Sequence, residues 1–418
     1  MSKDAKNVPA LRFRGYSDAW EKRKLGELAK VRTGRAFKSS SFSPNGKYYV
    51  VTNKDIGGPQ ISTHMDGDRI DITNPVDIAK YSLSGRNLLV TMDGVNIGKT
   101  AMYSNEDAVL AQRVGRLTSS SLDFVHQITS QKNFLTRMNE LSVGNAIKHI
   151  SLKQISDYAV NVPQQTSERQ LIGQTLSLLD NLIAATQDKL SFLKKMKMFF
   201  LQQIFPTKNH DVPQIRFDGF TDVWSHYKLG SLMRIDKEQE VKKELLTDIQ
   251  KGFYVLAMRT FSMDGYIDHS KPYWLNHLDN VSDDKFLLPR EFAILDADMD
   301  ANLPKIGRVL LNASSEKYLL AAHVRKIQVK SGNDPIFIYA LMRGNSVHER
   351  LKLEANGSIS KRLLDKNVYK QSILVPNRSE QSKIGRLFFL LETTITLHQQ
   401  KIQMLKQVKK SCLQNLFI

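Results

Sequence analysis

The sequence predicts an α+β protein in which two mixed α/β domains are separated by two long coiled-coil helices, the whole forming an internal pseudo-two-fold duplication. Three observations support this fold class. The chain has 418 residues, which is too long for one ordinary core. A leader sequence occurs twice, 204 residues apart, and an apolar heptad pattern occurs twice, 212 residues apart. Repeats at a fixed spacing indicate duplication rather than shared composition.

The leader is expected at residues 1–20 and again at 207–224. Its copies share Val-Pro, then Arg-Phe, then Gly with an aromatic residue, and finally Asp-x-Trp, which ends at Trp20 and Trp224. Lys-Leu-Gly follows in both copies, starting at Lys24 and Lys228. A match at Trp and Phe positions is very improbable by chance, so we expect both leaders to have the same structural role.

Long helices are expected at 164–206 and 377–418, each entered from Val-Pro at Val162 and Val375, where proline ends a strand and permits a helix to start. Each helix carries a heptad seam of more than thirty residues, or about 50 Å, which exceeds what a domain core requires. We expect the helices to pair with each other; the alternative is that each lies on its own domain. The proposed pairing positions are Ile172, Leu176, Leu179, Ile183, Thr186, Leu190, Leu193 and Phe200 in the first helix, and Ile384, Phe388, Leu391, Ile395, His398, Ile402, Leu405 and Cys412 in the second.

Residues 21–163 and 225–376 are expected to form the two mixed α/β domains. β-rich runs such as 48–52 and 253–256 alternate with turns that contain Asn, Gly and Asp. The interiors of the two copies have diverged, but a weak correspondence survives in loops that carry polar or basic side chains. The matched segments are 53–56 with 258–261, 97–99 with 306–308, 110–114 with 320–324, and Gly144, Lys148 and His149 with Gly357, Lys361 and Arg362.

The charge of the chain points toward a polyanionic partner. Sixty Lys and Arg against 42 acids give a net charge of +18. Residues 167–205 contribute +2 and residues 380–418 contribute +4, so +12 lies in the domains and leaders. No apolar run approaches the roughly 20 residues of a membrane helix. The polar first residues and the single Cys412 favour a reducing, cytoplasmic location.

The repeated Arg-Phe leader, the Val-Pro entry to each helix and the Leu-Gln-x-Leu/Ile-Phe helix ends at 201–205 and 413–417 resemble the specificity subunit of type I restriction-modification enzymes, the HsdS family. The resemblance implies two target recognition domains joined by an antiparallel pair of helices, each domain reading one half of an asymmetric bipartite DNA target. It also implies that the helices dock two modification subunits, which use S-adenosylmethionine to methylate adenine N6. Two restriction subunits, with ATP and Mg²⁺, would complete the complex, and no cofactor is expected in this chain.

Base reading needs side chains that reach the groove edges, with Arg or Lys on guanine and Asn or Gln on adenine. Polar and basic residues of the divergent loops are therefore the candidate DNA contacts, although phosphate contact is the commoner role of such residues. In the first domain they are Lys38, Asn53, Lys54, Asn96, Lys99, Gln112, Arg113, Lys148 and His149. In the second they are Arg259, Asn302, Lys305, Arg308, His323, Arg325, Lys361 and Arg362.

An antiparallel helix pair with local two-fold symmetry brings equivalent mid-helix positions close together. Thr186 and His398 interrupt the two seams at equivalent positions, as do Lys197 and Lys409. We therefore expect Thr186 and His398 to be neighbours that fix the register. The alternative is that both point outward.

Other functional readings are weaker. Gly94 to Thr100 resembles a phosphate-binding loop but has Asp93 where a glycine is required, so we interpret it as a turn near DNA. Asp296, Asp298 and Asp300 alternate as Mg²⁺ ligands can, or as one exposed strand face does, and the first copy has Val90, Met92 and Gly94 there. No Pro-Pro of an adenine methyltransferase motif occurs, so neither a catalytic nor a metal site is expected. The remaining alternative is a coiled-coil assembly protein with basic domains that read no DNA.

Overall fold

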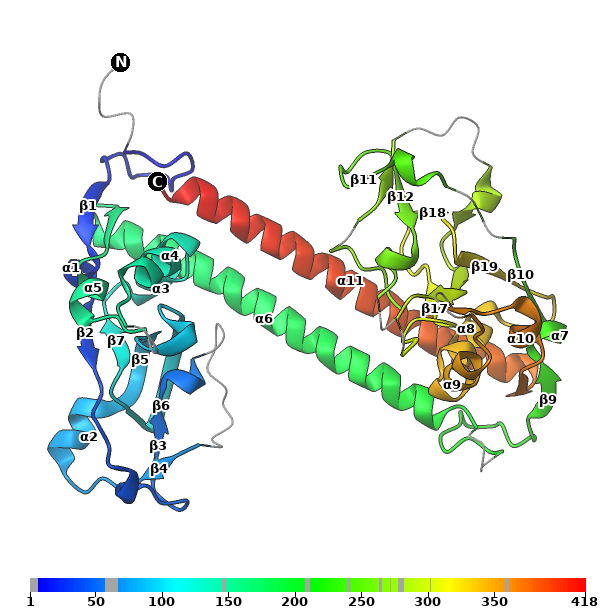
Figure 1. Cartoon of the computed structure of the whole chain (residues 1–418), viewed down its shortest axis with the longest axis horizontal. Coiled ribbons are helices and arrows are strands. Elements are labelled where there is room, and N and C mark those ends of the chain that lie inside the picture. Colours follow the sequence, from blue (N-terminus) through cyan, green and yellow to red (C-terminus); the bar gives the residue numbers. More distant parts are fainter. Residues whose placement is uncertain are drawn as a thin grey trace. The chain divides into compact units, whose positions relative to one another are not determined.

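The computed structural model describes residues 7–56, 67–144, 148–206, 211–237, 239, 241–262, 265–270, 272–276, 282–300, 302–357 and 361–418. The chain divides into two compact units (Figure 1). Unit 1 is Met1–Ala185 with Gln403–Ile418, and unit 2 is Thr186–Ile402. The long helices α6 (Thr166–Gln203) and α11 (Arg378–Leu416) each contribute to both units. In the described part of the chain, no helix is both long and apolar enough to cross a membrane.

Unit 1 is built on a six-stranded sheet with the order β2-β7-β5-β6-β3-β4. Alternate residues of β5 face two different cores, because successive strand side chains point to opposite faces. Leu88 and Val90 pack with Val125 of α3 and Phe134 of α4, whereas Leu89 packs in a second cluster. The elements are β1 (Glu21–Lys24), α1 (Leu25–Leu28), β2 (Lys30–Thr33), η2 (Ser39–Ser41), β3 (Tyr48–Val51), η3 (Asn53–Asp55), β4 (Arg69–Ile70), α2 (Pro75–Tyr81), β5 (Ser82–Thr91), η4 (Gly94–Asn96), β6 (Thr100–Leu110), β7 (Val114–Thr118), α3 (Leu122–Thr129), α4 (Lys132–Leu141), α5 (Leu152–Ser156) and β8 (Ala159–Val162).

Unit 2 repeats this plan with its long strand divided. The order β10-β19-β15-β17 matches β2-β7-β5-β6, and β12 runs parallel to β18 as β3 runs parallel to β6. The role of β6 is therefore shared by β17 and β18. The elements are β9 (Ser225–Lys228), α7 (Leu229–Leu232), β10 (Met233–Ile235), η5 (Lys243–Leu245), β11 (Leu246–Thr247), β12 (Phe253–Leu256), η6 (Met258–Thr260), β13 (Trp274–Leu275), η7 (Asp283–Lys285), β14 (Phe286–Leu287), β15 (Phe292–Leu295), β16 (Ala297–Asp298), β17 (Val309–Leu311), β18 (Tyr318–Leu320), β19 (Val324–Val329), α8 (Pro335–Arg343), α9 (Asn345–Leu353), β20 (Lys361–Arg362), α10 (Asp365–Tyr369) and β21 (Ser372–Val375).

Each leader is anchored to the end of a long helix in the same way. In unit 1 the Arg12 guanidinium donates to both oxygens of the buried Glu168 carboxylate, at 2.8 and 2.9 Å. In unit 2 Arg216 donates to both oxygens of the buried Glu380, at 2.7 and 2.8 Å. Trp20 packs edge-on against Phe417, and Trp224 against Phe205. The repeated Arg and Trp of the leader therefore have the same structural role in both units.

The two long helices pack antiparallel to each other within each unit. Lys409 pairs with Asp180 in unit 1, and Lys197 pairs with Glu392 in unit 2. These pairs are equivalent under the duplication, because Asp180 and Lys197 lie 212 residues before Glu392 and Lys409. All sixteen proposed seam residues are buried or half-buried. The alternative that each helix lies only on its own domain is therefore wrong.

The seam register separates the two polar interruptions. Counting six residues back from Lys197 on α6 and six forward from Glu392 on α11 puts Ser191, not Thr186, opposite His398. Thr186 is five positions, or about 7.5 Å along the axis, from Ser191. Thr186 is buried, so it does not point outward, whereas His398 is half-buried and its Nδ1 lies 2.8 Å from the Thr394 carbonyl. The expected direct opposition of Thr186 and His398 does not follow from this register.

Candidate nucleic-acid interface

Three loop positions that match between the two copies have similar backbone φ values. Gly98 and Gly307 have φ values of 77° and 73°, and Gly144 and Gly357 have 122° and 132°. Arg113 and His323 occupy the same left-handed position, with φ values of 68° and 71°. Left-handed conformations are uncommon for residues other than glycine, so the coincidence is informative. The loop correspondence expected from the sequence is confirmed.

In unit 1 a buried carboxylate joins two of these loops. Asp93 follows β5 and accepts a hydrogen bond of 2.6 Å from the Arg113 guanidinium through Oδ2. Its other oxygen, Oδ1, contacts His149 Nδ1. Asp93 is 8% exposed, whereas the side chains of Arg113 and His149 are 57% and 41% exposed. The hydrogen bond from Arg113 to Asp93 raises the pKa of Arg113, so this guanidinium remains charged.

Unit 2 also has a buried carboxylate between the two equivalent loops, with a different set of partners. Asp296 Oδ1 lies 3.1 Å from His323 Nδ1, and Oδ2 lies 3.4 Å from Arg325 and 3.8 Å from Arg362. Asp296 is buried, and desolvation raises its pKa, an effect opposed mainly by the hydrogen bond from His323. The Arg362 side chain is 48% exposed. Each unit therefore holds an Arg and a His on one buried aspartate.

Backbone hydrogen bonds define which residues are equivalent. The Met92 N–H donates to the Arg113 carbonyl, as the Asp296 N–H donates to the His323 carbonyl. Asp296 thus corresponds to Met92, not to Val90 as the sequence comparison suggested, because the two loops differ in length. Asp93 lies one residue later and reaches the same two neighbouring loops.

The remaining candidates of the first domain are mostly accessible. Five of them are exposed and lie in loops or a short 3₁₀ turn, namely Lys38, Lys54, Lys99, Gln112 and Lys148. Asn53 and Asn96 are half-buried. The amide oxygen of Asn53 is buried and has no hydrogen-bond partner among the described residues. The cations among them are therefore accessible at the surface of the domain.

The second-domain candidates divide into accessible and internally bound side chains. Arg325 donates to both oxygens of Asp365 at 2.5 and 2.9 Å and is only 13% exposed. Arg259 donates to Asp248 and stacks on the Tyr273 ring at 3.4 Å from its centroid. We assign these two a structural role in place of base reading. Asn302 and Arg362 are exposed, while Lys305, Arg308, His323 and Lys361 are half-buried.

Comparison with known proteins agrees with this geometry. The family model described as type I restriction modification DNA specificity domain matches residues 17–195 and again 221–407. The chain belongs to this family. Among solved structures, the S subunit of a type I restriction-modification system from M. genitalium matches 98% of this chain and 99% of its own, at 15% identity and a TM-score of 0.71. The HsdS subunit from Thermoanaerobacter tengcongensis matches 96% and 97%, at 11% identity and a TM-score of 0.35. No curated protein sequence matches the chain.

As a type I specificity subunit, the protein recognises DNA sequence through its two target recognition domains. This excludes the alternative of an assembly protein that reads no DNA. The likeness to the M. genitalium subunit shows the common fold over nearly the whole length.

The acidic run of this specificity subunit does not form one exposed strand face. Asp296 and Asp298 are both buried. The Asp298 carboxylate accepts the backbone N–H groups of Asp300 and Lys305, at 3.0 and 2.8 Å. Among the described residues, no three His, Cys, Asp or Glu side chains form a group that could hold a metal ion. The run therefore shapes the loop that carries Lys305, which is one of the DNA-contact candidates.

The largest missed signals were the carboxylate of Asp93 and the outer faces of the helices. In the sequence, Asp93 only argues against a phosphate-binding loop, whereas in the structure it binds Arg113 and His149. Exposed apolar residues recur every seven positions, immediately before seam positions. They are Leu171, Leu178, Phe192 and Phe199 on α6, and Leu390, Leu397 and Met404 on α11. These exposed apolar residues form a stripe beside the seam on each helix. The stripe could have been found from the sequence by testing each heptad position for apolar residues.

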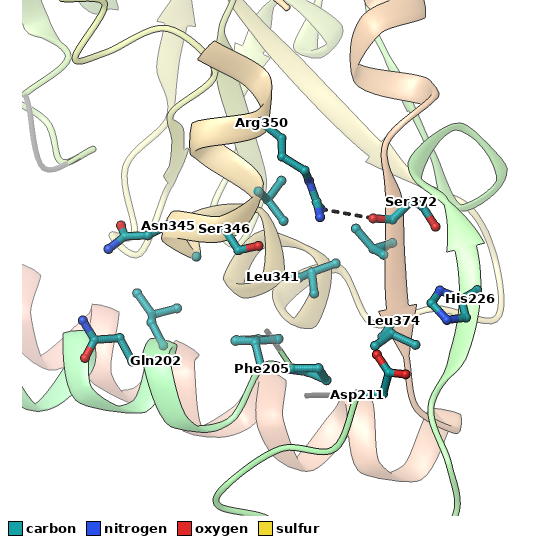
Figure 2. A pocket seen from close by; sticks show the side chains of 15 residues that line it. Gln202, Phe205, Asp211, His226, Leu341, Asn345, Ser346, Arg350, Ser372 and Leu374 are labelled. Atoms are coloured by element: carbon teal, nitrogen blue, oxygen red, sulfur yellow. Dashed lines mark hydrogen bonds between the residues drawn. The ribbon is translucent and has the colours of Figure 1, made fainter. Parts of the chain in front are cut away.

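A cavity of about 360 Å³ lies in unit 2 beside the end of α6, between helices α8 and α9 and strands β9 and β21 (Figure 2). Arg350 lies at this cavity and donates to the Ser372 carbonyl at 3.1 Å (Figure 2). Equivalent positions in unit 1, including Arg137 and Ala159, line a second hollow. None of the DNA-contact candidates lines either one. The duplication therefore extends to these hollows, which are separate from the candidate interface.

Proposed function

We propose that each target recognition domain reads its half-site with the accessible side chains of the loops that follow β5, β6 and α4 in unit 1 and their counterparts in unit 2. The observation that carries this proposal is the recurrence of cations at matched loop positions while the surrounding residues differ. Lys99 with Arg308 and Lys148 with Lys361 are such matches. Matched cations suit phosphates, which are the same in any sequence, and differing neighbours suit bases, which are not.

A domain exchange tests this assignment. Residues 21–161 are replaced by the equivalent domain of a relative, and the methylated sites produced with the modification subunit are sequenced. One half-site should change while the other half-site stays the same. A change in both halves would contradict independent reading by the two domains.

The chain itself is proposed to be non-catalytic, and the chemistry is proposed to belong to its partners. The sequence contains no Pro-Pro, which an adenine methyltransferase motif requires. The modification subunits would hold S-adenosylmethionine and methylate adenine N6. The restriction subunits would use ATP and Mg²⁺.

Two modification subunits are proposed to dock on the exposed apolar stripes of the helices. Unit 1 presents Leu178 of α6 with Met404 of α11, and unit 2 presents Leu390 of α11 with Phe192 of α6. Leu178 and Leu390 are 212 residues apart, and so are Phe192 and Met404. A heptad stripe of exposed large apolar side chains is typical of a helix face that binds further helices. The duplication presents this face twice, which supports two copies of one partner.

Native mass spectrometry of the complex tests the stoichiometry. The wild-type chain should bind two modification subunits, and Leu178→Glu or Leu390→Glu alone should reduce this to one. Both changes together should leave none. Asn181→Glu adds the same charge at an exposed position outside the stripe and should keep two subunits. Retention of two subunits by the double variant would contradict docking on the stripes.

A further inference from the structure

The two buried aspartates suggest how one fold reads two different half-sites. In unit 1 Arg occupies the left-handed position and His occupies the loop after α4, at Arg113 and His149. In unit 2 the same two residue types are exchanged, with His323 at the left-handed position and Arg362 in β20, which follows α9. The backbone positions are equivalent, because Gly144 and Gly357 precede each loop with matching conformations.

We propose that Asp93 and Asp296 are positioning residues for these pairs, and that the exchange of Arg and His is a determinant of the difference between the two half-sites. This inference rests on the proposed assignment of the loops to the DNA interface. The ligand class is the major-groove edge of a base pair, with guanine O6 and N7 favoured opposite the arginine.

The two aspartates are buried, whereas three of the Arg and His side chains that they contact are substantially exposed. Asp93 and Asp296 are 8% and 4% exposed, so a base cannot reach their carboxylates directly. Arg113, His149 and Arg362 each expose between 41% and 57% of the side chain. Arg113 donates to Asp93 through a single nitrogen, Nη1, at 2.6 Å, which restrains the guanidinium while the rest of its exposed fork stays accessible. Fixing the rotamer in this way is what discrimination between bases requires.

Unit 2 contains an additional support that unit 1 lacks. Arg325 also binds Asp296 and is itself held by Asp365. The equivalent of Arg325 in unit 1 is Gly115, since Val90 pairs with Gly115 as Ile294 pairs with Arg325. Among the residues that the structure describes, the Asp93 side chain contacts Arg113 and His149, so unit 1 offers the simpler test.

The test uses the full chain in complex with its modification subunit and sequences the methylated sites on a plasmid library with random inserts. The double variant Arg113→His with His149→Arg gives unit 1 the arrangement of unit 2 without changing its composition. It should alter the unit 1 half-site at one or more base pairs, and leave the unit 2 half-site unchanged. Asp93→Asn should lower discrimination at the same base pairs by about tenfold or more. Asp296→Asn should act on the other half-site alone.

Two controls keep the outcome decisive. Asp107→Asn removes a charge at an exposed position of unit 1 that has no part in the clamp, and should return the wild-type target. Arg113→Lys keeps the charge at an exposed site but loses the fork, so it should relax the half-site even if the buried Asp93→Asn variant fails to fold. A purely structural role of Asp93 would lower thermal stability without changing which bases are selected.

Wild-type half-sites from the exchange variant, Arg113→Lys and both folded aspartate variants would overturn this inference. A wild-type complex that methylates without any half-site preference would instead overturn the proposed function. The two failures are therefore distinguishable.

Discussion

The ion pair between Lys197 and Glu392 gives the sharpest test of how the helices are held in unit 2. Lys197 and Glu392 are 1% and 2% exposed, and the Tyr339 hydroxyl also donates to Glu392, at 2.5 Å. Lys197 donates to the Tyr266 hydroxyl at 2.8 Å. Burial lowers the pKa of Lys197 to about 8, although Glu392 opposes this shift. The pair is therefore shielded from water, so each charge depends on the other and on the two tyrosine hydroxyls for compensation.

Lys197→Met should remove the cation and leave the Glu392 carboxylate buried, with Tyr339 as its remaining donor among the described residues. Breaking one side of a buried pair costs about 3–5 kcal/mol in the free energy of unfolding. At about 2–4 °C per kcal/mol, the thermal midpoint of the transition that carries unit 2 should fall by about 6–20 °C. Differential scanning calorimetry of the full chain measures this shift.

The duplication supplies the control. Lys409→Met breaks the equivalent pair in unit 1, where the Lys409 and Asp180 side chains are 22% and 32% exposed. Water can replace the lost partner there, so the cost should be about 1 kcal/mol or less. The double change of Lys197 and Glu392 to Met should recover most of the loss, because neither charge of the pair then remains buried. Equal effects of Lys197→Met and Lys409→Met would refute this reasoning.

Three further predictions concern pH, the leaders and the helix length. Burial lowers the pKa of His348 to about 4, so unfolding takes up a proton and stability should fall by up to about 3 kcal/mol as pH drops from 6.5 to 4. His348→Leu, the residue type at the equivalent Leu135, should remove that acid-side slope in urea titrations, and an unchanged slope would exclude His348 as its source. Arg12→Met and Arg216→Met leave Glu168 and Glu380 buried without a cation and should each cost about 3–5 kcal/mol by chemical denaturation; a loss below about 1 kcal/mol would contradict the anchoring role. Four residues inserted after Ala184 and after the equivalent Thr396 lengthen each helix by about 6 Å and should lengthen the preferred spacer by about two base pairs, whereas methylated sites with altered half-sites and an unchanged spacer would exclude a ruler role.

The duplication could be predicted from the sequence because its signals are local along the chain. The Arg-Phe leader and the seven-residue spacing of apolar side chains each depend only on neighbours within a few turns. The loop matches at Gly98 and Gly144 also survived, since a left-handed backbone favours glycine whatever the surrounding sequence. Expectations of this kind agree with the structure.

Long-range partners could not be predicted in the same way. The sequence put Arg325 among the base readers, but its guanidinium is held by Asp365, forty positions later. In the sequence, Asp93 is only the residue that disqualifies a phosphate-binding loop, but its carboxylate contacts His149, 56 positions away. The sequence put Thr186 opposite His398, because matched seam positions give the symmetry of two helices but not their relative shift. The ion pairs of Lys197 and Lys409 fix that shift.

The sequence by itself thus determined the repeated architecture, the heptad seams and the family to which the chain belongs. Only the tertiary structure decided which polar side chains are internal and which remain accessible to DNA. The physical reason is that a repeat is a property of spacing along the chain, whereas burial and hydrogen-bond partners depend on which distant segments meet. The exchange of Arg and His between Arg113 and His149 and their counterparts is invisible until both are seen on one buried carboxylate.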